Sequence, residues 1–239
     1  MKRNLIFSKG LLLLVLILTF PAAFLKAQNF SGRLILGING SQIDGDGMSG
    51  YYKPGLVAGL GVRFPINEKI RIGPEFMYSM KGSKASFDQV TIQGFLPITY
   101  RLNYIDLPIV LDYQISGDIQ AESGLSYGRL LNAKLDNGTN QTKNNFLDVS
   151  SLFNKSDFQF LIGLKYKIFD NIWLSGRFLY SVVSTNAQGL TNPNYGMIGL
   201  PSRGGFFNNL LQITLSAHLF GSTGEASRTE VNPASGLKP

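Results

Sequence analysis

The chain of 239 residues contains no cysteine. This absence excludes disulfide bonds, thiolate nucleophiles and thiolate metal ligands. The sequence also has a single histidine, His218, and nothing around it identifies the catalytic base of a hydrolase or acyltransferase. Beyond residue 27 no apolar run is long enough for a membrane helix. If the mature protein crosses a membrane, it must therefore do so with strands.

The N-terminus has the pattern of an export signal. A positively charged start precedes an apolar run over residues 11–25, which ends just before Ala27. A single transmembrane anchor is the alternative, but the run is shorter than the roughly 20 apolar residues that a span requires, and Pro21 interrupts it. We therefore expect residues 1–27 to be a secretory signal peptide, cleaved after Ala27.

The basic character of the chain comes largely from this segment. The formal net charge is +7, and four of the lysines and arginines lie within residues 1–27, so the mature chain carries about +3. No stretch of the remaining sequence concentrates lysine and arginine. The electrostatic footprint expected of a nucleic-acid-binding protein is therefore missing.

Eight stretches between residues 31 and 220 alternate apolar and polar side chains. They cover residues 31–39, 55–64, 70–81, 102–115, 119–131, 158–168, 172–182 and 208–219. Such alternation predicts strands with one apolar and one polar face. Stretches of about ten residues match a tilted crossing of a bilayer, whereas strands of globular proteins are nearer five or six residues long.

The connections between these stretches are short and long in strict alternation. The short ones cover residues 65–69, 116–118 and 169–171, and the long ones cover 41–53, 82–99, 132–156 and 185–205. This asymmetry is typical of an outer-membrane β-barrel, whose turns are short on one side of the membrane and long on the other. Pro74 and Pro108 fall within predicted strands and predict local bulges there.

The polar face of the predicted strands carries glycine and charges of both signs, Lys81 among them. The charged residues expected to fill the lumen are Arg33, Arg63, Arg71, Glu75, Asp106, Asp112, Glu122, Lys165, Lys167 and Arg177. An eight-stranded barrel is just wide enough for its own side chains, so we expect these residues to form a structural ion-pair network that plugs it. The predicted fold is all-β, an eight-stranded antiparallel up-and-down transmembrane β-barrel with a filled polar lumen.

Two loop segments have weaker patterns. Residues 44–47, Asp-Gly-Asp-Gly, match half of a calcium-binding loop but lack its remaining ligands, so a turn is the favoured interpretation. Residues 146–153 predict a short amphipathic helical turn that packs on the barrel rim or contacts a partner. No catalytic, cofactor-binding or metal-binding residues are predicted.

Three segments, residues 53–61 (KPGLVAGLG), 104–109 (YIDLPI) and 157–163 (DFQFLIG), resemble the PorT-like outer-membrane β-barrel proteins of the Bacteroidetes. The resemblance covers the mature barrel and implies an outer-membrane location. One branch of that family is associated with type IX protein secretion, and no catalytic residues carry over. Phe220 closes the last predicted strand, as an aromatic residue often does in this family. Residues 221–239 are rich in Gly, Ser, Pro and charge, and we expect them to be a disordered tail.

The sequence thus predicts a signal peptide (1–27), an outer-membrane barrel (28–220) and a C-terminal tail (221–239). The main hypothesis is a monomeric, non-enzymatic barrel, without cofactor, that contacts outer-membrane lipid and other envelope or secretion proteins but no nucleic acid. Three alternatives remain: a porin-like barrel that passes small solutes, a soluble lipocalin-like carrier, and a lipid-modifying enzyme that depends on His218.

Overall fold

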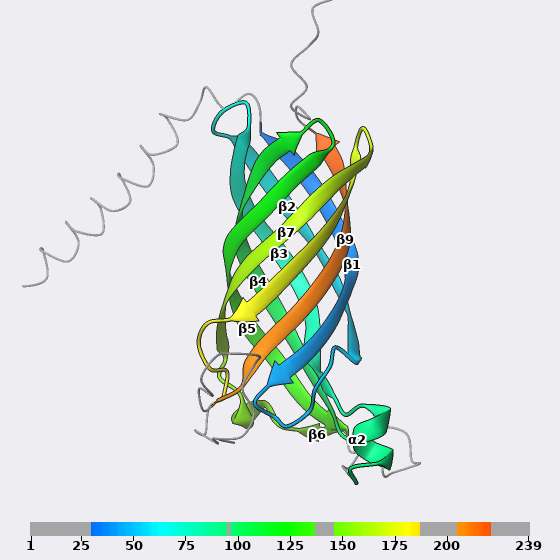
Figure 1. The fold of residues 1–239 in the computed structure, drawn as a ribbon. Coiled ribbons are helices and arrows are strands. Elements are labelled where there is room, and N and C mark those ends of the chain that lie inside the picture. Colours follow the sequence, from blue (N-terminus) through cyan, green and yellow to red (C-terminus); the bar gives the residue numbers. More distant parts are fainter. Residues whose placement is uncertain (1–29, 95–96, 137–145, 187–204, 221–239) are drawn as a thin grey trace, which may run out of the picture.

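The computed structural model describes residues 30–94, 97–136, 146–186 and 205–220, in which eight long antiparallel strands close into a barrel (Figure 1). The strands are β1 (Ser31–Asp44), β2 (Lys53–Pro65), β3 (Ile70–Lys84), β4 (Thr99–Ser116), β5 (Ile119–Asp136), β7 (Ser156–Phe169), β8 (Ile172–Ser181) and β9 (Phe207–Phe220). Each pairs with the next along the chain, and β9 pairs with β1. The predicted up-and-down barrel is confirmed.

The two ends of the barrel differ. The connections 66–69, 117–118 and 170–171 lie at one end, which we call the short-turn rim, together with Ser31 and Phe220. The opposite end, the long-loop rim, carries three small elements, α2 (Phe87–Thr91), β6 (Leu147–Asp148) and the 3₁₀ helix η2 (Ser150–Leu152). The predicted signal peptide and tail lie outside the described residues.

Several strands extend further toward the long-loop rim than the alternation predicts. β1 continues to Asp44, although a loop over residues 41–53 is predicted, and β5 continues to Asp136. Backbone pairing carries these extensions, since Ser41 pairs with Lys53 and Asp44 with Phe207. A β-ladder depends on backbone groups, so it continues where the side-chain alternation has ended.

The expected bulges at Pro74 and Pro108 are wrong. Pro74 pairs with Ile109 and Met77 pairs with Asp106. The register of β3 against β4 is therefore the same on both sides of the unpaired residues that lie between these two pairs. A proline removes one backbone donor but adds no residue, so the ladder is interrupted without a shift. The register does shift elsewhere in the β4–β5 pair, between Asn103 and Tyr104 and near the 117–118 turn.

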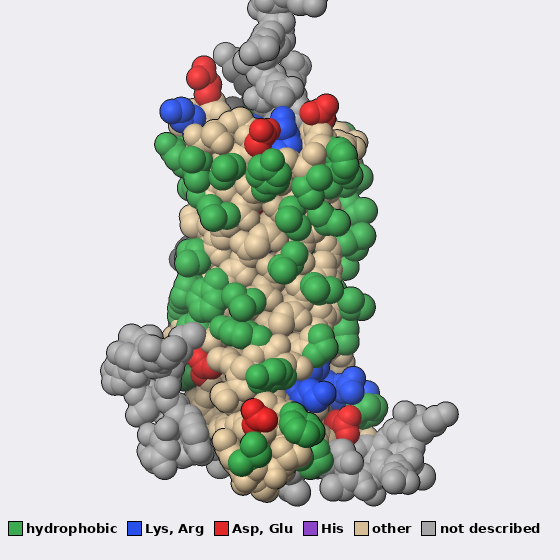
Figure 2. Space-filling view, turned by 45° about the vertical axis from the view of Figure 1, so that its right-hand side comes forward, with side chains coloured by type: hydrophobic (Ala, Val, Ile, Leu, Met, Phe, Trp, Pro, Cys, Tyr) green, Lys and Arg blue, Asp and Glu red, His purple; other side chains and the backbone are tan. Residues whose placement is uncertain are grey.

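The outer wall is apolar and the interior is polar. Outward side chains such as Leu56, Leu125 and Leu164 are 62%, 68% and 61% exposed, and Figure 2 shows apolar side chains over the wall with most charged ones near its two ends. The inward face buries Arg63 and Gln159. This distribution is the reverse of a soluble barrel with an apolar core, and it matches a wall that faces lipid. Within the described ranges, no helix is both long and apolar enough to span a membrane.

Candidate functional site

The middle of the lumen holds seven charged side chains in mutual contact. This central ion network consists of Arg33, Arg63, Glu75, Asp112, Glu122, Lys165 and Arg177. Asp112 accepts from three cations: Arg33 Nη2 lies 2.8 Å, Arg63 Nε 3.1 Å and Lys165 Nζ 3.3 Å from its Oδ2. All seven side chains are almost completely buried. Buried charges are tolerated only with such close partners.

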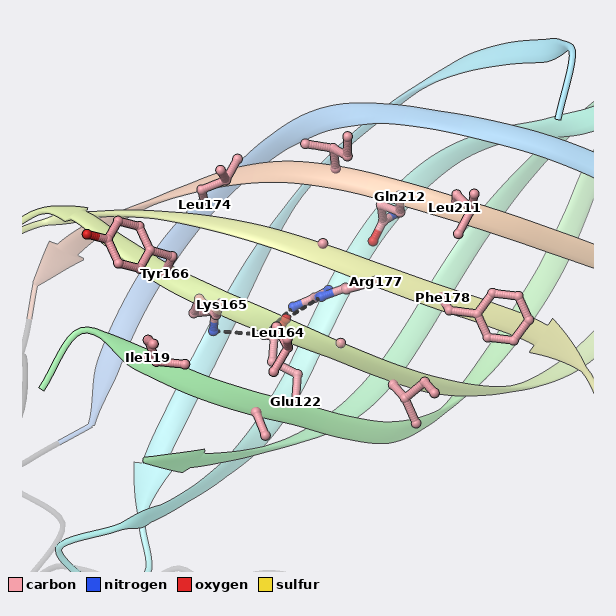
Figure 3. A pocket seen from close by; sticks show the side chains of 15 residues that line it. Ile119, Glu122, Leu164, Lys165, Tyr166, Leu174, Arg177, Phe178, Leu211 and Gln212 are labelled. Carbon is pink, nitrogen blue, oxygen red and sulfur yellow. Dashed lines mark hydrogen bonds and ion pairs between the residues drawn. The ribbon is translucent and has the colours of Figure 1, made fainter. Parts of the chain in front are cut away.

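Arg177 connects opposite walls of the barrel. Its Nη1 donates to Glu75 Oε2 at 2.7 Å, and its Nη2 donates to Glu122 Oε1 at 2.9 Å. Glu75 lies on β3, which is four strands from β8 in either direction around the closed sheet. Figure 3 shows Lys165 and Arg177 both pointing toward Glu122. The network therefore crosses the full width of the lumen.

A second group lies in the lumen between this network and the long-loop rim. Lys81 Nζ is 2.9 Å from Asp106 Oδ1 and 3.6 Å from Asp157 Oδ2. Asp157 also accepts from Ser181 at 2.7 Å and from Asn208 at 2.8 Å. The central network has four cations and three anions, and this second group has one cation and two anions, so their formal charges cancel.

An apolar cluster closes the lumen at the long-loop rim. Its buried members are Ile43, Leu102, Tyr104, Leu130, Ala133, Val149 and Phe153. Val149 and Phe153 flank η2, so the predicted packing of residues 146–153 on the rim is observed, with a 3₁₀ turn as the short helical turn and the two-residue strand β6 before it. Two smaller buried apolar clusters, one with Val110 and Leu161 and one with Ile35 and Val57, lie elsewhere inside the barrel, so apolar filling is most extensive at this rim.

The structure separates the predicted lumen residues into three places. Seven of the ten form the central network, and Asp106 belongs to the second group. Arg71 and Lys167 are half-buried near the short-turn rim, where Lys167 lies 3.7 Å from Asp118. The sequence analysis does not include Asp157 among the lumen residues, because Asp157 precedes the predicted strand at 158–168. It lies two residues before Gln159 and therefore on the same, inward face of the strand.

Two titratable residues outside the ion network, His218 and Asp46, have surroundings that bear on possible chemistry. His218 faces the cations Arg33, Lys165 and Arg71, and its Nδ1 has no hydrogen-bond partner within the described part of the chain. In the β1–β2 loop, burial raises the pKa of Asp46 to about 7. No group of three or more residues able to hold a metal ion occurs among the described residues.

A groove of about 960 Å³ lies in the wall over β5, β7, β8 and β9 (Figure 3). It opens where Gly176 faces outward, since no atom lies within 4 Å of the position that a Cβ would take there. The outward walls are apolar and include Leu164, Leu211 and Ile213. The lining also includes Glu122, Lys165 and Arg177, so this groove in the apolar outer surface borders the central ion network.

Comparison with known proteins gives a family and a fold. Residues 26–186 match the family described as "Outer membrane protein beta-barrel domain". None of the curated proteins matches the chain. Among solved structures, Ail of Yersinia pestis is 13% identical, with a TM-score of 0.46 and coverage of 80% of this chain and 98% of Ail.

Two further barrels are similar at the same distant level. Neisserial surface protein A is 10% identical, with a TM-score of 0.43 and coverage of 79% of this chain and 95% of that protein. The outer membrane enzyme PagL is 11% identical, with a TM-score of 0.37 and coverage of 77% of this chain and 98% of PagL. These identities are too low to transfer a function from any of the three.

Proposed function

This chain belongs to the family of outer membrane protein beta-barrel domains, and on that premise we propose that it is a closed barrel that serves the cell envelope as a non-enzymatic binding component. The central ion network carries the proposal. It links opposite walls through Arg177 and pairs the lumen charges with one another. A solute channel, in contrast, requires a continuous polar path lined by free side chains.

The proposed contacts lie at the two rims. In barrels of this kind the short turns face the periplasm and the long loops face the cell exterior. The long-loop rim offers the more varied surface, with α2 held by its Ser86–Gln89 capping box and by the bond from Gln89 Nε2 to the Gly47 carbonyl. We infer that this rim is where other envelope components bind.

The finer proposal is a PorT-like role in association with protein secretion. It rests on the three segments at residues 53–61, 104–109 and 157–163, which fall at β2, β4 and β7. Extraction of the native protein in mild detergent, followed by affinity purification, tests it. Secretion components should co-purify, and recovery of the barrel alone would remove the secretion role but leave the closed barrel intact.

Planar-bilayer recording tests the closed lumen directly. The purified full chain is expected to give no steady current under conditions in which a reconstituted porin conducts. A steady open current would refute the plugged barrel and favour solute transport. A lipid-modifying activity that is lost in His218→Ala would refute the non-enzymatic assignment instead, so the two failures are distinguishable.

A further inference from the structure

Exposed cations gather on one sector of the outer wall at the long-loop rim. Lys84, Arg101 and Lys134 lie on the neighbouring strands β3, β4 and β5, and all three side chains are exposed. Arg101 pairs with Lys134 on one side and with Gly82, two residues before Lys84, on the other. We call these three residues the rim basic patch. Figure 2 shows Lys and Arg side chains gathered where the apolar wall ends at this rim.

Two of the three cations in the rim basic patch repel each other. Arg101 and Lys134 stand directly opposite each other in an antiparallel pair, where like charges repel. The ring of Phe146 lies 5.1 Å from Arg101 Cζ and 5.9 Å from Lys134 Nζ, which orients both cations. An anion placed between the two cations relieves their repulsion.

Nearby acids do not remove these cations from solvent. Asp136 Oδ2 lies 3.5 Å from Arg101 Nη2, with the two side chains 36% and 45% exposed. Asp148 pairs with Lys134 across the short β5–β6 ladder and is also exposed. Exposed ion pairs of this kind contribute little free energy, so a stronger anionic ligand can displace them.

The position of the patch indicates the class of ligand. It lies at the edge of the apolar wall, which is the depth of lipid headgroups in a membrane. At the same rim on β1 and β9, Gln42 and Asp44 are half-buried and Asn209 is buried, and none of these three residues carries a positive charge. Guanidinium and ammonium groups recognise phosphate, the former with two parallel hydrogen bonds. We propose that the rim basic patch binds the phosphate-bearing headgroup of a lipid in the outer leaflet.

The test titrates the full chain, purified in a neutral detergent, with fluorescent phosphatidic acid. Arg101→Gln should weaken binding about fivefold, since each cation near a membrane surface contributes on this scale. Lys69→Gln is the matched control, because Lys69 is an exposed cation at the short-turn rim, and it should leave binding unchanged. Asp136→Asn should tighten binding, because it removes the anion that competes for Arg101.

Three results would overturn the proposal. Equal effects of Arg101→Gln and Lys69→Gln would show general charge attraction, and equal binding of fluorescent phosphatidylcholine would show recognition of acyl chains alone. Displacement of the lipid by an equal concentration of inorganic phosphate would assign the patch to free phosphate. Looser binding in Asp136→Asn would assign Asp136 and Arg101 a structural role. None of these outcomes depends on whether the lumen conducts.

Discussion

Replacement of Arg177 by methionine should destabilise the folded barrel by about 3–5 kcal/mol, the cost of removing one partner from a buried ion pair. Arg177 donates four hydrogen bonds to Glu75 and Glu122, at 2.7–3.0 Å. These bonds do not add, because they share one guanidinium group. After its loss Glu75 retains Arg63 and Glu122 retains Lys165, so both carboxylates stay charged but are poorly compensated.

A double-mutant cycle isolates this cause. Arg177→Met combined with Glu122→Gln keeps the net charge of the lumen, and Glu75 and Lys165 still have Arg63 and Asp112 as partners. The double variant should therefore be more stable than the sum of the single losses predicts, with a coupling free energy of about 0.5–3 kcal/mol.

Unfolding by urea in detergent micelles measures these free energies. Trp173 is the only tryptophan and is 3% exposed, so a change in its fluorescence reports the unfolding of the barrel interior. A loss below about 1 kcal/mol in Arg177→Met, within the range of an exposed pair, would refute a structural role for the network. Simple additivity in the double variant would show that Arg177 does not act through Glu122.

Two further predictions concern the pairing of β1 with β9 and the β1–β2 loop. Gly37→Ala should reduce the heat-resistant folded fraction on gel electrophoresis, because a Cβ at Gly37 would collide with the backbone carbonyl oxygen of Ile213 on β9. Gly117→Ala, with open space around it, should not. The stability that Asp46 contributes to the β1–β2 loop should be complete below pH 4 and lost as the pH rises through about 7, since burial raises the folded pKa above the unfolded value. Amide hydrogen exchange over residues 44–52 should therefore accelerate between pH 5 and 8, after correction for the intrinsic rate, and a similar acceleration in Asp46→Asn would contradict this.

The alternation in the sequence predicts which face of a strand a residue occupies, because that depends only on a period of two. It therefore places Arg177, Glu75 and Glu122 in the lumen. It does not give their height along the barrel, which depends on strand tilt and register across the sheet. That Arg177 reaches Glu75, 102 residues away, and that Asp106 pairs in a separate group, follow only from the closed structure.

The register shift near Asn103 also could not be predicted from the sequence. An unbroken alternation along β5 would turn Lys134 inward, since Leu130 is inward. The shift between Asn103 and Tyr104 places Ala133 in the buried apolar cluster instead and leaves Lys134 exposed. One extra residue on β5 thus brings Ala133 into the apolar closure of the lumen and Lys134 into the rim basic patch. No local sequence signal marks it.

The pairing of β9 with β1 joins the first and last strands of the barrel, and it constrains how the protein assembles. Until residues 207–220 have been synthesised, β1 has a row of unpaired backbone groups along one edge. Each such group costs several kcal/mol in hydrocarbon. A partly built sheet therefore has no stable position inside the bilayer. Entry into the membrane and closure of the cylinder must be a single event, and a chain shortened by its final strand should accumulate on the periplasmic side as a substrate for proteolysis.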